Sequence, residues 1–505
     1  MSNRDVGDIL GYHEATKHSV ESVYRKSHHL DWEIMPRPFK VYTDLEPIPL
    51  PRDFTTSTRP ALSAIADPGT AAGNGPPLDR RALARLLYFS AGIVRRRKYA
   101  GGEIYFRAAA CTGALYHIDL YLACGPLADL DAGVYHFGPH DFALRRLRTG
   151  DHRGAVAAAT GGDPSVAGAP VVLFCSTTFW RNAWKYQARA YRHAFWDAGT
   201  LLANLLALAA AVDLPARIVL GFVDDEMNRL LGLDTEREVT VALVALGRGA
   251  PPPPPAPAAS PLALETLPPS SREVDYPAIR KAHAASSLGN AKKVDAWRSA
   301  LPPRPFVAPG GTAIPLAPPL TVPEPIETVI LRRGSTRQFA AAPVPFEVLS
   351  TILRTATRGI PADFVAPGAS LSDVYLIVHA VERLEPGTYV LDRGANALLP
   401  LRAGSFRREA GHLGLGQALP AEAAFDVFWL TDLRPVLERF GNRGYRAAQL
   451  EAAIEGGKAY LAAYALGIGA TGLTFFDDDV TRFFSPHAAG KSVMFLVAAG
   501  RPAAR

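Results

Sequence analysis

Apolar residues recur along the chain with the spacings of helices and strands. Leu83, Leu86 and Leu87 follow the spacing of one helix face, which predicts a helix that begins at Asp79. Segments rich in bulky apolar residues predict buried strands, and a continuous apolar run at 201–212 predicts part of a core helix. The remaining predicted elements are strands over 118–123, 170–175 and 239–245, a turn at 133–136, and helices over 191–212 and 224–231.

A proline-rich stretch divides these apolar segments into two groups. Five consecutive prolines occupy 251–255, and Ala and Pro continue to Pro269. Because proline cannot continue a helix or a strand ladder, we predict a semi-rigid linker here. A chain of 505 residues is also too long for one ordinary core. The expected organisation is an N-terminal extension over 1–60, a first domain over 61–250, a linker over 251–270, a connecting extension over 271–325 and a second domain over 326–505.

The segments on the two sides of the linker repeat one another at a nearly constant offset of 254 residues. Chance gives one or two such matches but not an ordered series, and so long a period excludes a solenoid of short repeats. We therefore predict two copies of one domain, fused so that their interface imitates the two-fold axis of a homodimer. The matches are Tyr121-Leu122 with Tyr375-Leu376, Gly133 and Tyr135 with Gly387 and Tyr389, Ala143-Leu144 with Ala397-Leu398, Arg189, Tyr191 and Arg192 with Arg443, Tyr445 and Arg446, Asp224-Asp225 with Asp478-Asp479, and, with a one-residue slip, Gly247-Arg248 with Gly500-Arg501.

The second half contains a segment suited to phosphate, 333–337, called here the clamp segment. Arg333, Ser335 and Arg337 stand at alternate positions ahead of a predicted helix over 346–355. Two guanidinium groups and a hydroxyl beside a helix start can hold one phosphate, although a solvated basic turn has the same composition. The aligned place in the first half, 67–71, carries none of these groups.

The first half contains two features that the second half lacks. Residues 107–116, called here the ring segment, are mostly small and would let a flat ligand lie against backbone, whereas the counterpart at 364–370 is shortened. Lys185 and Tyr186 precede the long predicted helix, where burial at a pocket mouth would lower the pKa of the lysine toward neutrality. Their counterparts are Arg439, which stays charged, and Phe440, which has no proton to transfer. Each half therefore retains a different part of one site.

Composition narrows the class of protein. The net charge of +6 is small for this length, and no basic run is interleaved with aromatic residues, so we expect no nucleic-acid partner. The run Arg95–Lys98 is expected to be a solvated helix end. The apolar run at 201–212 is too short to span a bilayer, and residues 1–5 show no secretory signal. Three cysteines without metal-type spacing predict a cytoplasmic protein with no metal site and no disulfide framework: Cys111, Cys124 and Cys175.

Six short motifs, taken together in order, carry a resemblance to a known family. They are Tyr-His-x-x-Thr-Lys-His at 12–18, Gly-Ala-Leu-Tyr at 113–116, Lys-Tyr at 185–186, Arg-x-Ser-x-Arg at 333–337, Asn-Arg-Gly-Tyr-Arg at 442–446 and Thr-Gly-Leu-Thr-Phe-Phe-Asp-Asp at 471–478. With these motifs the chain resembles the SagB-type dehydrogenases, FMN-dependent enzymes of the nitroreductase superfamily that form thiazoles and oxazoles in peptides. The resemblance covers most of 10–250 and 325–502.

The resemblance implies a fold and a set of site residues. The fold is α+β: two tandem nitroreductase-like domains, each a mostly antiparallel sheet flanked by helices, forming a pseudo-dimer within one chain, so that a monomer suffices. FMN would lie between the halves. Ala110 and Cys111 stand where the family has Pro and Ser, and His117 replaces a Pro. The implied cofactor-binding residues are Arg333, Ser335, Arg337 and Arg501 for the phosphate, Cys111, Thr112, Gly113 and Ala114 beside the ring, and backbone near Gly472 and Thr474; the implied catalytic residues are Lys185 and Tyr186.

The expected function follows from the resemblance and from the unequal halves. One composite site is nearly complete and the opposite one is not, so we expect one FMN per chain. Lys185 would take a ring proton, or lower the pKa of Tyr186, while FMN takes a hydride from a peptide thiazoline or oxazoline. A cyclodehydratase would be the partner that supplies this peptide. Alternatives are an NAD(P)H-dependent nitro- or quinone reductase, a dehydrogenase of a carrier-bound or small-molecule intermediate, and a non-catalytic scaffold.

Overall fold

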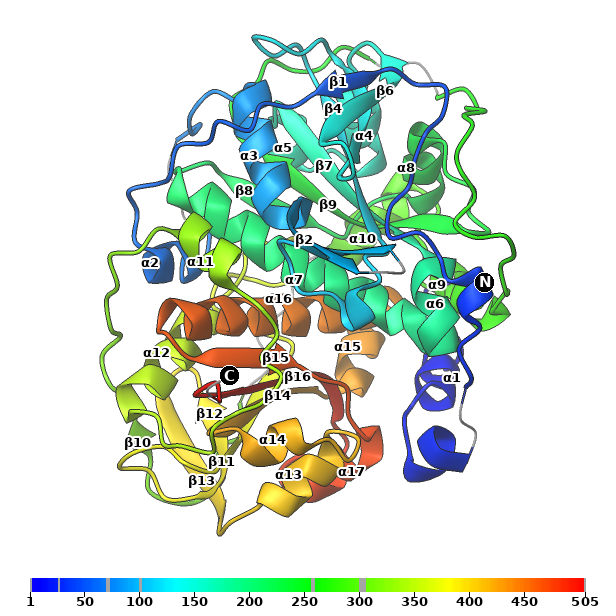
Figure 1. Ribbon diagram of the computed structural model, residues 1–505. Coiled ribbons are helices and arrows are strands. Elements are labelled where there is room, and N and C mark those ends of the chain that lie inside the picture. Colours follow the sequence, from blue (N-terminus) through cyan, green and yellow to red (C-terminus); the bar gives the residue numbers. More distant parts are fainter. Residues whose placement is uncertain are drawn as a thin grey trace.

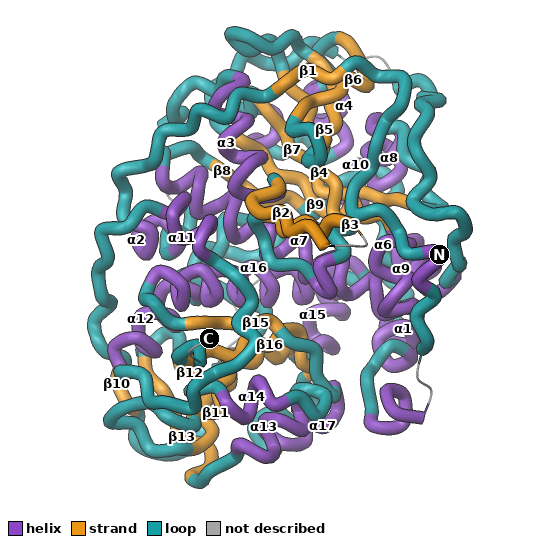
Figure 2. Tube along the Cα trace, in the orientation of Figure 1, coloured by secondary structure: helices purple, strands orange, loops and turns teal. Residues whose placement is uncertain are grey.

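Two seven-stranded antiparallel sheets form the centres of the two halves (Figures 1 and 2). The computed structural model describes residues 2–25, 28–69, 73–99, 102–255, 259–298 and 306–503. Both sheets have the same strand order, which confirms the predicted α+β fold with two copies of one domain. The first sheet runs β1 (Pro47–Pro49), β6 (Ala143–Thr149), β5 (Gly133–Gly138), β4 (Ile118–Cys124), β7 (Val171–Thr178), β9 (Glu238–Leu246), β8 (Ala216–Val219), and the second runs β10 (Ile314–Pro315), β13 (Ala397–Ala403), β12 (Gly387–Asp392), β11 (Asp373–Val378), β14 (Phe425–Thr431), β16 (Ser492–Gly500), β15 (Gly469–Gly472).

Helices flank both sheets (Figure 1). Those up to residue 298 are α1 (Gly7–Ala15), α2 (Ala61–Ile65), α3 (Arg80–Ala91), α4 (Arg153–Ala159), α5 (Pro164–Ala167), α6 (Phe179–Tyr186), α7 (Ala190–Ala211), α8 (Asp224–Leu231), α9 (Pro277–Ala285) and α10 (Ala291–Arg298), with a π-turn at Glu21–Arg25 and 3₁₀ turns at Trp32–Ile34, Thr112–Ala114 and Gln187–Arg189. Those of the second half are α11 (Ile326–Arg332), α12 (Phe346–Ala356), α13 (Arg407–Leu413), α14 (Ala418–Glu422), α15 (Leu433–Phe440), α16 (Arg443–Ala465) and α17 (Asp477–Phe484).

The two longest helices, α7 and α16, pack together between the two sheets (Figure 1). Glycine allows their close approach at two places. A Cβ on Gly199 would lie 2.5 Å from the Cβ of Ala453, and a Cβ on Gly457 would lie 2.7 Å from that of Ala203. Both pairs are separated by 254 residues, so a pseudo-two-fold axis passes between these contacts, as the predicted fused dimer requires.

The helical run Phe179–Ala211 is long enough and apolar enough to span a membrane, but its most apolar stretch is completely buried inside the protein. A run of this kind is the core helix of a folded domain, as the apolar pattern predicted. Helix α7 also matches the predicted helix over 191–212 to within one residue at each end.

Two buried ion-pair clusters join the halves. Asp477 accepts hydrogen bonds from Arg189 at 2.9 Å and from Arg192 at 2.6 Å. In the other half, Asp224 accepts from two arginines at 2.7 Å each, Arg443 and Arg446. The structure therefore matches Asp224 with Asp477, and the predicted match of Asp224 with Asp478 is wrong. The one-residue slip that we placed at the end of the repeat therefore occurs earlier in the chain, before α8 and α17 begin.

Segments outside the predicted domains complete both clusters in the same way. Arg192 donates to the His13 carbonyl and to Thr16 Oγ1 at 3.0 Å. Arg446 donates to the carbonyl of His283 and to the hydroxyl of Ser286, both at 2.8 Å. Thus α1 in the N-terminal extension and α9 in the connecting extension are structural counterparts.

Asp224→Asn is expected to destabilise the protein by about 3 kcal/mol, because it leaves two buried guanidinium groups without a counter-charge. Burial alone would raise the pKa of Asp224, but Arg443 and Arg446 outweigh it and lower the pKa to about 2. This contribution is complete above about pH 4 and is lost as the pH falls through about 2. Urea unfolding at neutral pH measures the loss. The exposed neighbour gives the matched control, Asp225→Asn, and equal unfolding midpoints for the two variants would contradict the prediction.

Two predicted local structures are wrong. The expected turn at 133–136 is the start of β5, where a Cβ on Gly133 would lie 2.7 Å from the Arg148 carbonyl oxygen of the paired strand. This glycine marks a close approach between strands. The run Arg95–Lys98 lies in β2 (Ile93–Tyr99), which pairs with β3 (Gly102–Arg107) in a separate two-stranded hairpin. Parts of three predicted segments lie outside the described residues: 70–72, 256–258 and 299–305.

Candidate functional site

The clamp segment follows α11 and reaches across to the first half. Arg333 Nε donates to the Ala108 carbonyl at 3.1 Å, and Nη2 donates to the Arg107 carbonyl at 3.3 Å. Ser335 and Arg337 are exposed, and the Ser335 hydroxyl accepts a hydrogen bond from Tyr460 at 2.8 Å. The structure thus brings the clamp segment of one half against the ring segment of the other.

Arg501 lies beside this region. Its carbonyl accepts a hydrogen bond from Ala340, three residues beyond Arg337. Its Nε, however, donates to the Pro343 carbonyl at 2.9 Å. One nitrogen of the Arg501 side chain is therefore committed to the protein's own backbone.

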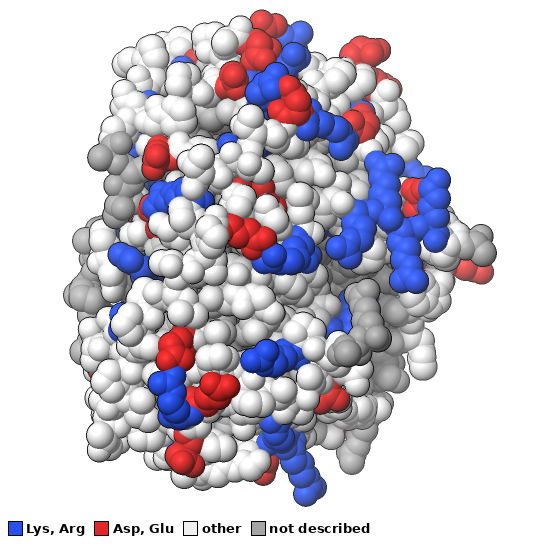
Figure 3. Space-filling model, turned by 60° about the vertical axis from the view of Figure 1, so that its left-hand side comes forward, with Lys and Arg blue, Asp and Glu red and all other residues white. Residues whose placement is uncertain are grey.

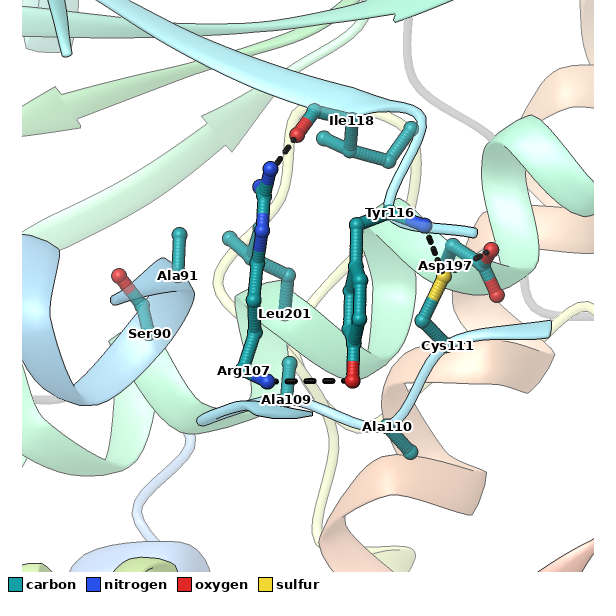
Figure 4. A pocket seen from close by; sticks show the side chains of 10 residues that line it. All are labelled: Ser90, Ala91, Arg107, Ala109, Ala110, Cys111, Tyr116, Ile118, Asp197 and Leu201. Atoms are coloured by element: carbon teal, nitrogen blue, oxygen red, sulfur yellow. Dashed lines mark hydrogen bonds between the residues drawn. The ribbon is translucent and has the colours of Figure 1, made fainter. Parts of the chain in front are cut away.

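Asp197, a buried residue of α7, lies beside Cys111 and holds the ring segment in place (Figure 4). One carboxylate oxygen accepts from the Thr112 amide at 2.9 Å and the Thr112 hydroxyl at 2.7 Å. The other accepts from the Cys111 thiol at 3.0 Å and is 2.8 Å from His117 Nε2. Burial and the charge of Asp197 raise the pKa of Cys111, so its sulfur stays a protonated donor.

The tip of the ring segment contacts Tyr186. Gly113 and Ala114 are exposed and both have positive φ angles. A Cβ on Gly113 would lie 2.8 Å from the Tyr186 hydroxyl, so no larger residue fits here without displacing the phenol. The backbone of the ring segment and the Tyr186 side chain therefore form one surface.

Lys185 and Tyr186 lie at the end of α6 and not at the start of the following helix, because Gln187 takes a φ of 50° and interrupts the helical run. The expectation that Lys185 is buried at a pocket mouth is wrong, since its side chain is exposed. Its Nζ lies 5.4 Å from the centroid of the Tyr186 ring. Burial raises the pKa of Tyr186, with Asp197 and Cys111 adding to the effect, so the expected lowering of this pKa by Lys185 is wrong. Tyr186 is a protonated phenol with an amine beside it.

The opposite interface is built differently. The backbone of Ile218–Leu220, which matches Gly472–Thr474, is covered by a loop of the second half. Ile218 donates to the Pro361 carbonyl at 2.8 Å, and the Asp363 carboxylate accepts from two backbone amides at 2.8 Å each, Leu220 and Gly221. Among the described residues, no backbone hydrogen bond joins Gly472–Thr474 to the first half. The equivalent surfaces are therefore open on one side and occupied on the other.

Two cavities lie near these surfaces. The one drawn in Figure 4, lined by Arg107 and Tyr116 of the ring segment and by Asp197 of α7, has a volume of about 20 Å³, which suffices for one water molecule. A flavin ring therefore needs the outer face of the ring segment. A cavity of about 420 Å³ remains at the opposite interface, beside Asp363 and Arg358. In the part of the chain that the structure describes, no cluster of three His, Cys, Asp or Glu side chains could hold a metal ion.

Sequence reasoning missed Asp197 and Asp363. The repeat contains a signal for the first, because Asp197 is the one acidic residue of the mostly apolar α7, and the residue 254 positions later is Glu451. The Glu451 carboxylate accepts from the Leu371 amide at 2.9 Å, so both halves use a helix carboxylate to hold this loop. The role of Asp363 depends on residues more than 140 positions away and has no signal in the sequence.

Comparison with known proteins agrees with this architecture. The nitroreductase family model matches residues 114–248 and 330–501, more than half of the chain. The nitroreductase-family protein MJ1384 of Methanocaldococcus jannaschii is 24% identical over 172 residues, which cover 34% of this chain and 82% of the relative. The microcin B17-processing protein McbC of Escherichia coli is 29% identical over 138 residues, 26% of this chain and 50% of the relative. A crystal structure of a nitroreductase-family protein from Anabaena variabilis superimposes with a TM-score of 0.79 at 26% identity and covers 98% of this chain and 99% of its own. The chain belongs to the nitroreductase family.

Proposed function

We propose that this chain is an FMN-dependent oxidoreductase that dehydrogenates a peptide azoline, a thiazoline or oxazoline, to the aromatic azole. One observation carries the proposal. At a single interface the clamp segment meets the ring segment, and Tyr186 contacts the tip of that ring segment. The opposite interface has Phe440 in place of the tyrosine and the Asp363 loop over the matching backbone.

The residues of this interface fit FMN. Arg333, Ser335 and Arg337 would hold the phosphate, since an arginine fork gives paired charge-assisted hydrogen bonds to phosphate oxygens. The exposed backbone at Gly113 and Ala114, with Cys111 and Thr112 held by Asp197, would lie along the ring, opposite the backbone of Gly472–Thr474. When bound, FMN supplies a two-electron acceptor for hydride. We propose one FMN per chain, with Arg501 as an outer contact.

The protein's own groups divide the remaining work. Aromatisation removes a proton and a hydride from the azoline, and the Lys185 amine accepts the proton. Tyr186, kept protonated by its raised pKa, donates a hydrogen bond that polarises the heterocycle. Asp197 acts as a positioning residue, because it holds Cys111, Thr112 and His117 and so fixes the surface on which the reaction takes place.

Two observations favour a peptide substrate. One of the relatives, McbC, is named for processing a peptide, microcin B17, and shares 29% identity over 138 residues. The site is also open, since Lys185, Gly113 and Ala114 are all exposed, which suits an azoline carried within a longer chain. A cyclodehydratase that makes the azoline is the partner this function needs, and the cytoplasm is the compartment we propose for both.

Anaerobic mixing of the FMN-loaded protein with a short thiazoline-containing peptide tests the function. The visible flavin absorbance is expected to bleach while the peptide loses two hydrogens by mass, because the flavin takes both electrons. Bleaching by NADPH without peptide, and none by the azoline, would instead identify a nitro- or quinone reductase. Bleaching by a small-molecule azoline alone would indicate a different substrate class, and a protein that never binds FMN would be a scaffold.

A further inference from the structure

The first half contains an insertion beside the composite site. Leu83, Leu86 and Leu87 match Leu349, Ile352 and Leu353 at an offset of 266, whereas the later matches have an offset of 254. The first half therefore has 12 extra residues between its helix α3 and its strand β4. The structure places the β2–β3 hairpin in this interval, and the second half has no hairpin among the described residues between α12 and β11. The insertion is confined to the half that supplies the ring segment and Lys185.

The hairpin is strongly cationic. Arg95, Arg96, Arg97 and Lys98 are consecutive and exposed, and Glu103 is the one carboxylate on the hairpin. These four exposed cations and one carboxylate sum to +3, and the buried Arg107 at the end of β3 is a further cation. Figure 3 shows the resulting concentration of positive charge on the protruding edge of the molecule. A charge that is neither balanced nor buried contributes little to folding and is available for a partner.

The two faces of the hairpin differ. On one face Arg96 donates to the His140 carbonyl at 3.3 Å, and Lys98 lies 3.6 Å from Glu103. On the other face are Arg95 and Arg97, whose backbone pairs with β3 but whose side chains make no hydrogen bond or ion pair with any described residue. Tyr99 and Ile104, 56% and 42% exposed, lie on that same face, because they are opposite Gly102 and Arg97 in the strand register. This face combines two unpaired guanidinium groups with exposed apolar surface.

The hairpin is joined directly to the ring segment. Strand β3 ends at Arg107, whose guanidinium donates to the Ile118 carbonyl at 3.2 Å and whose main chain begins the ring segment. The Ala108 amide donates to the Gly92 carbonyl at 3.0 Å and closes the base of the hairpin. Both outer edges of this two-stranded sheet lack a strand partner among the described residues. An extended peptide bound along either edge would thus run toward the composite site.

We infer that the outer face of the β2–β3 hairpin binds an acidic, extended segment of the peptide substrate. The inference rests on the proposed function. Arg95 and Arg97 are two residues apart on a strand, about 7 Å, which is also the spacing of alternate side chains in an extended peptide. A segment with carboxylates at alternate positions would pair with both guanidinium groups while adding a strand to the sheet edge.

Two alternative roles for these charges would give different behaviour. Cations on an exposed strand edge also prevent edge-to-edge aggregation, and that role would need no partner. Single-stranded nucleic acid binds along extended basic grooves with aromatic platforms, whereas Arg95 to Lys98 spans only about 10 Å and alternates between two faces. The run Arg95 to Lys98 therefore matches a short acidic peptide better than a polynucleotide.

Fluorescence anisotropy of the FMN-loaded protein with a dansyl-labelled peptide of alternating Glu and Ser tests the inference. We expect saturable binding that weakens with added salt, and no binding of the matched peptide with Gln in place of Glu. The double substitution Arg95→Glu/Arg97→Glu is expected to weaken binding at least tenfold while flavin content stays unchanged. Because the readout is binding, it does not depend on whether the protein oxidises azolines.

The control variant Lys292→Glu/Lys293→Glu makes the same change in net charge at exposed positions of α10. It is expected to bind the acidic peptide within twofold of the wild type. Equal binding by the hairpin variant and the wild type would overturn the inference, as would an equal loss in the α10 variant. Tighter binding of a single-stranded oligonucleotide than of the acidic peptide would also overturn it. Aggregation of the hairpin variant without any change in peptide affinity would assign the charges to edge protection.

Discussion

Arg333→Ala is expected to fold but to purify with little bound FMN. The substitution removes the guanidinium that we assign to the phosphate, and two charge-assisted hydrogen bonds are worth about 3 kcal/mol, or about a hundredfold in Kd. It also removes the donors to the Ala108 and Arg107 carbonyls, which align the clamp segment with the ring segment. Flavin absorbance per chain after purification, followed by titration with added FMN, measures the loss.

The adjacent arginine provides a matched control. Arg332 is exposed and pairs with Glu324 at 2.6 Å, so Arg332→Ala is expected to retain its flavin. Arg333→Lys keeps the charge without the planar fork and should bind FMN with intermediate affinity. Wild-type protein is expected to hold one FMN per chain. Full flavin content in Arg333→Ala would remove the clamp assignment, and a wild-type ratio near two would contradict the single site.

The sequence predicted the architecture well wherever local pattern and long-range packing agree. Helix α8 has the predicted bounds and α7 differs by one residue, because a buried helix keeps one periodicity over its whole length. The repeat predicted the fused dimer because its matched arginines, such as Arg192 and Arg446, both pair with an aspartate of the opposite half. A contact that forms twice in one chain requires the same residue types at two positions, so the sequence shows it twice.

Features that arise from contacts between the halves were not predictable in this way. Asp363 occupies backbone amides of Leu220 and Gly221, a contact set by how the halves dock. Lys185 was expected at a helix start. The helix α6 ends instead just before Gln187, which has a positive φ, and the sequence does not predict a positive φ at a residue other than glycine. The hairpin at Arg95–Lys98 was expected to be a helix end, since four consecutive charges have no alternation of apolar and polar positions from which a strand is predicted.

Lys185→Ala is expected to keep its FMN and to lose azoline oxidation by at least about a hundredfold, the usual contribution of a positioned proton acceptor. Its side chain is exposed and touches none of the residues assigned to the phosphate, so flavin content and fold should not change. The rate of flavin bleaching by the thiazoline peptide measures the effect.

The pseudo-symmetry of the chain supplies the control for this prediction. Arg439 stands 254 residues after Lys185, at the same place on α15 as Lys185 on α6, but its neighbour is Phe440, which lines the cavity beside Asp363. If catalysis belongs to one interface, Arg439→Ala should oxidise the peptide at the wild-type rate. Unchanged turnover in Lys185→Ala would remove it as the base. Equal losses in both variants would mean that both interfaces take part in the reaction. The structure argues against this, because the Asp363 carboxylate accepts hydrogen bonds from the Leu220 and Gly221 amides at the second interface.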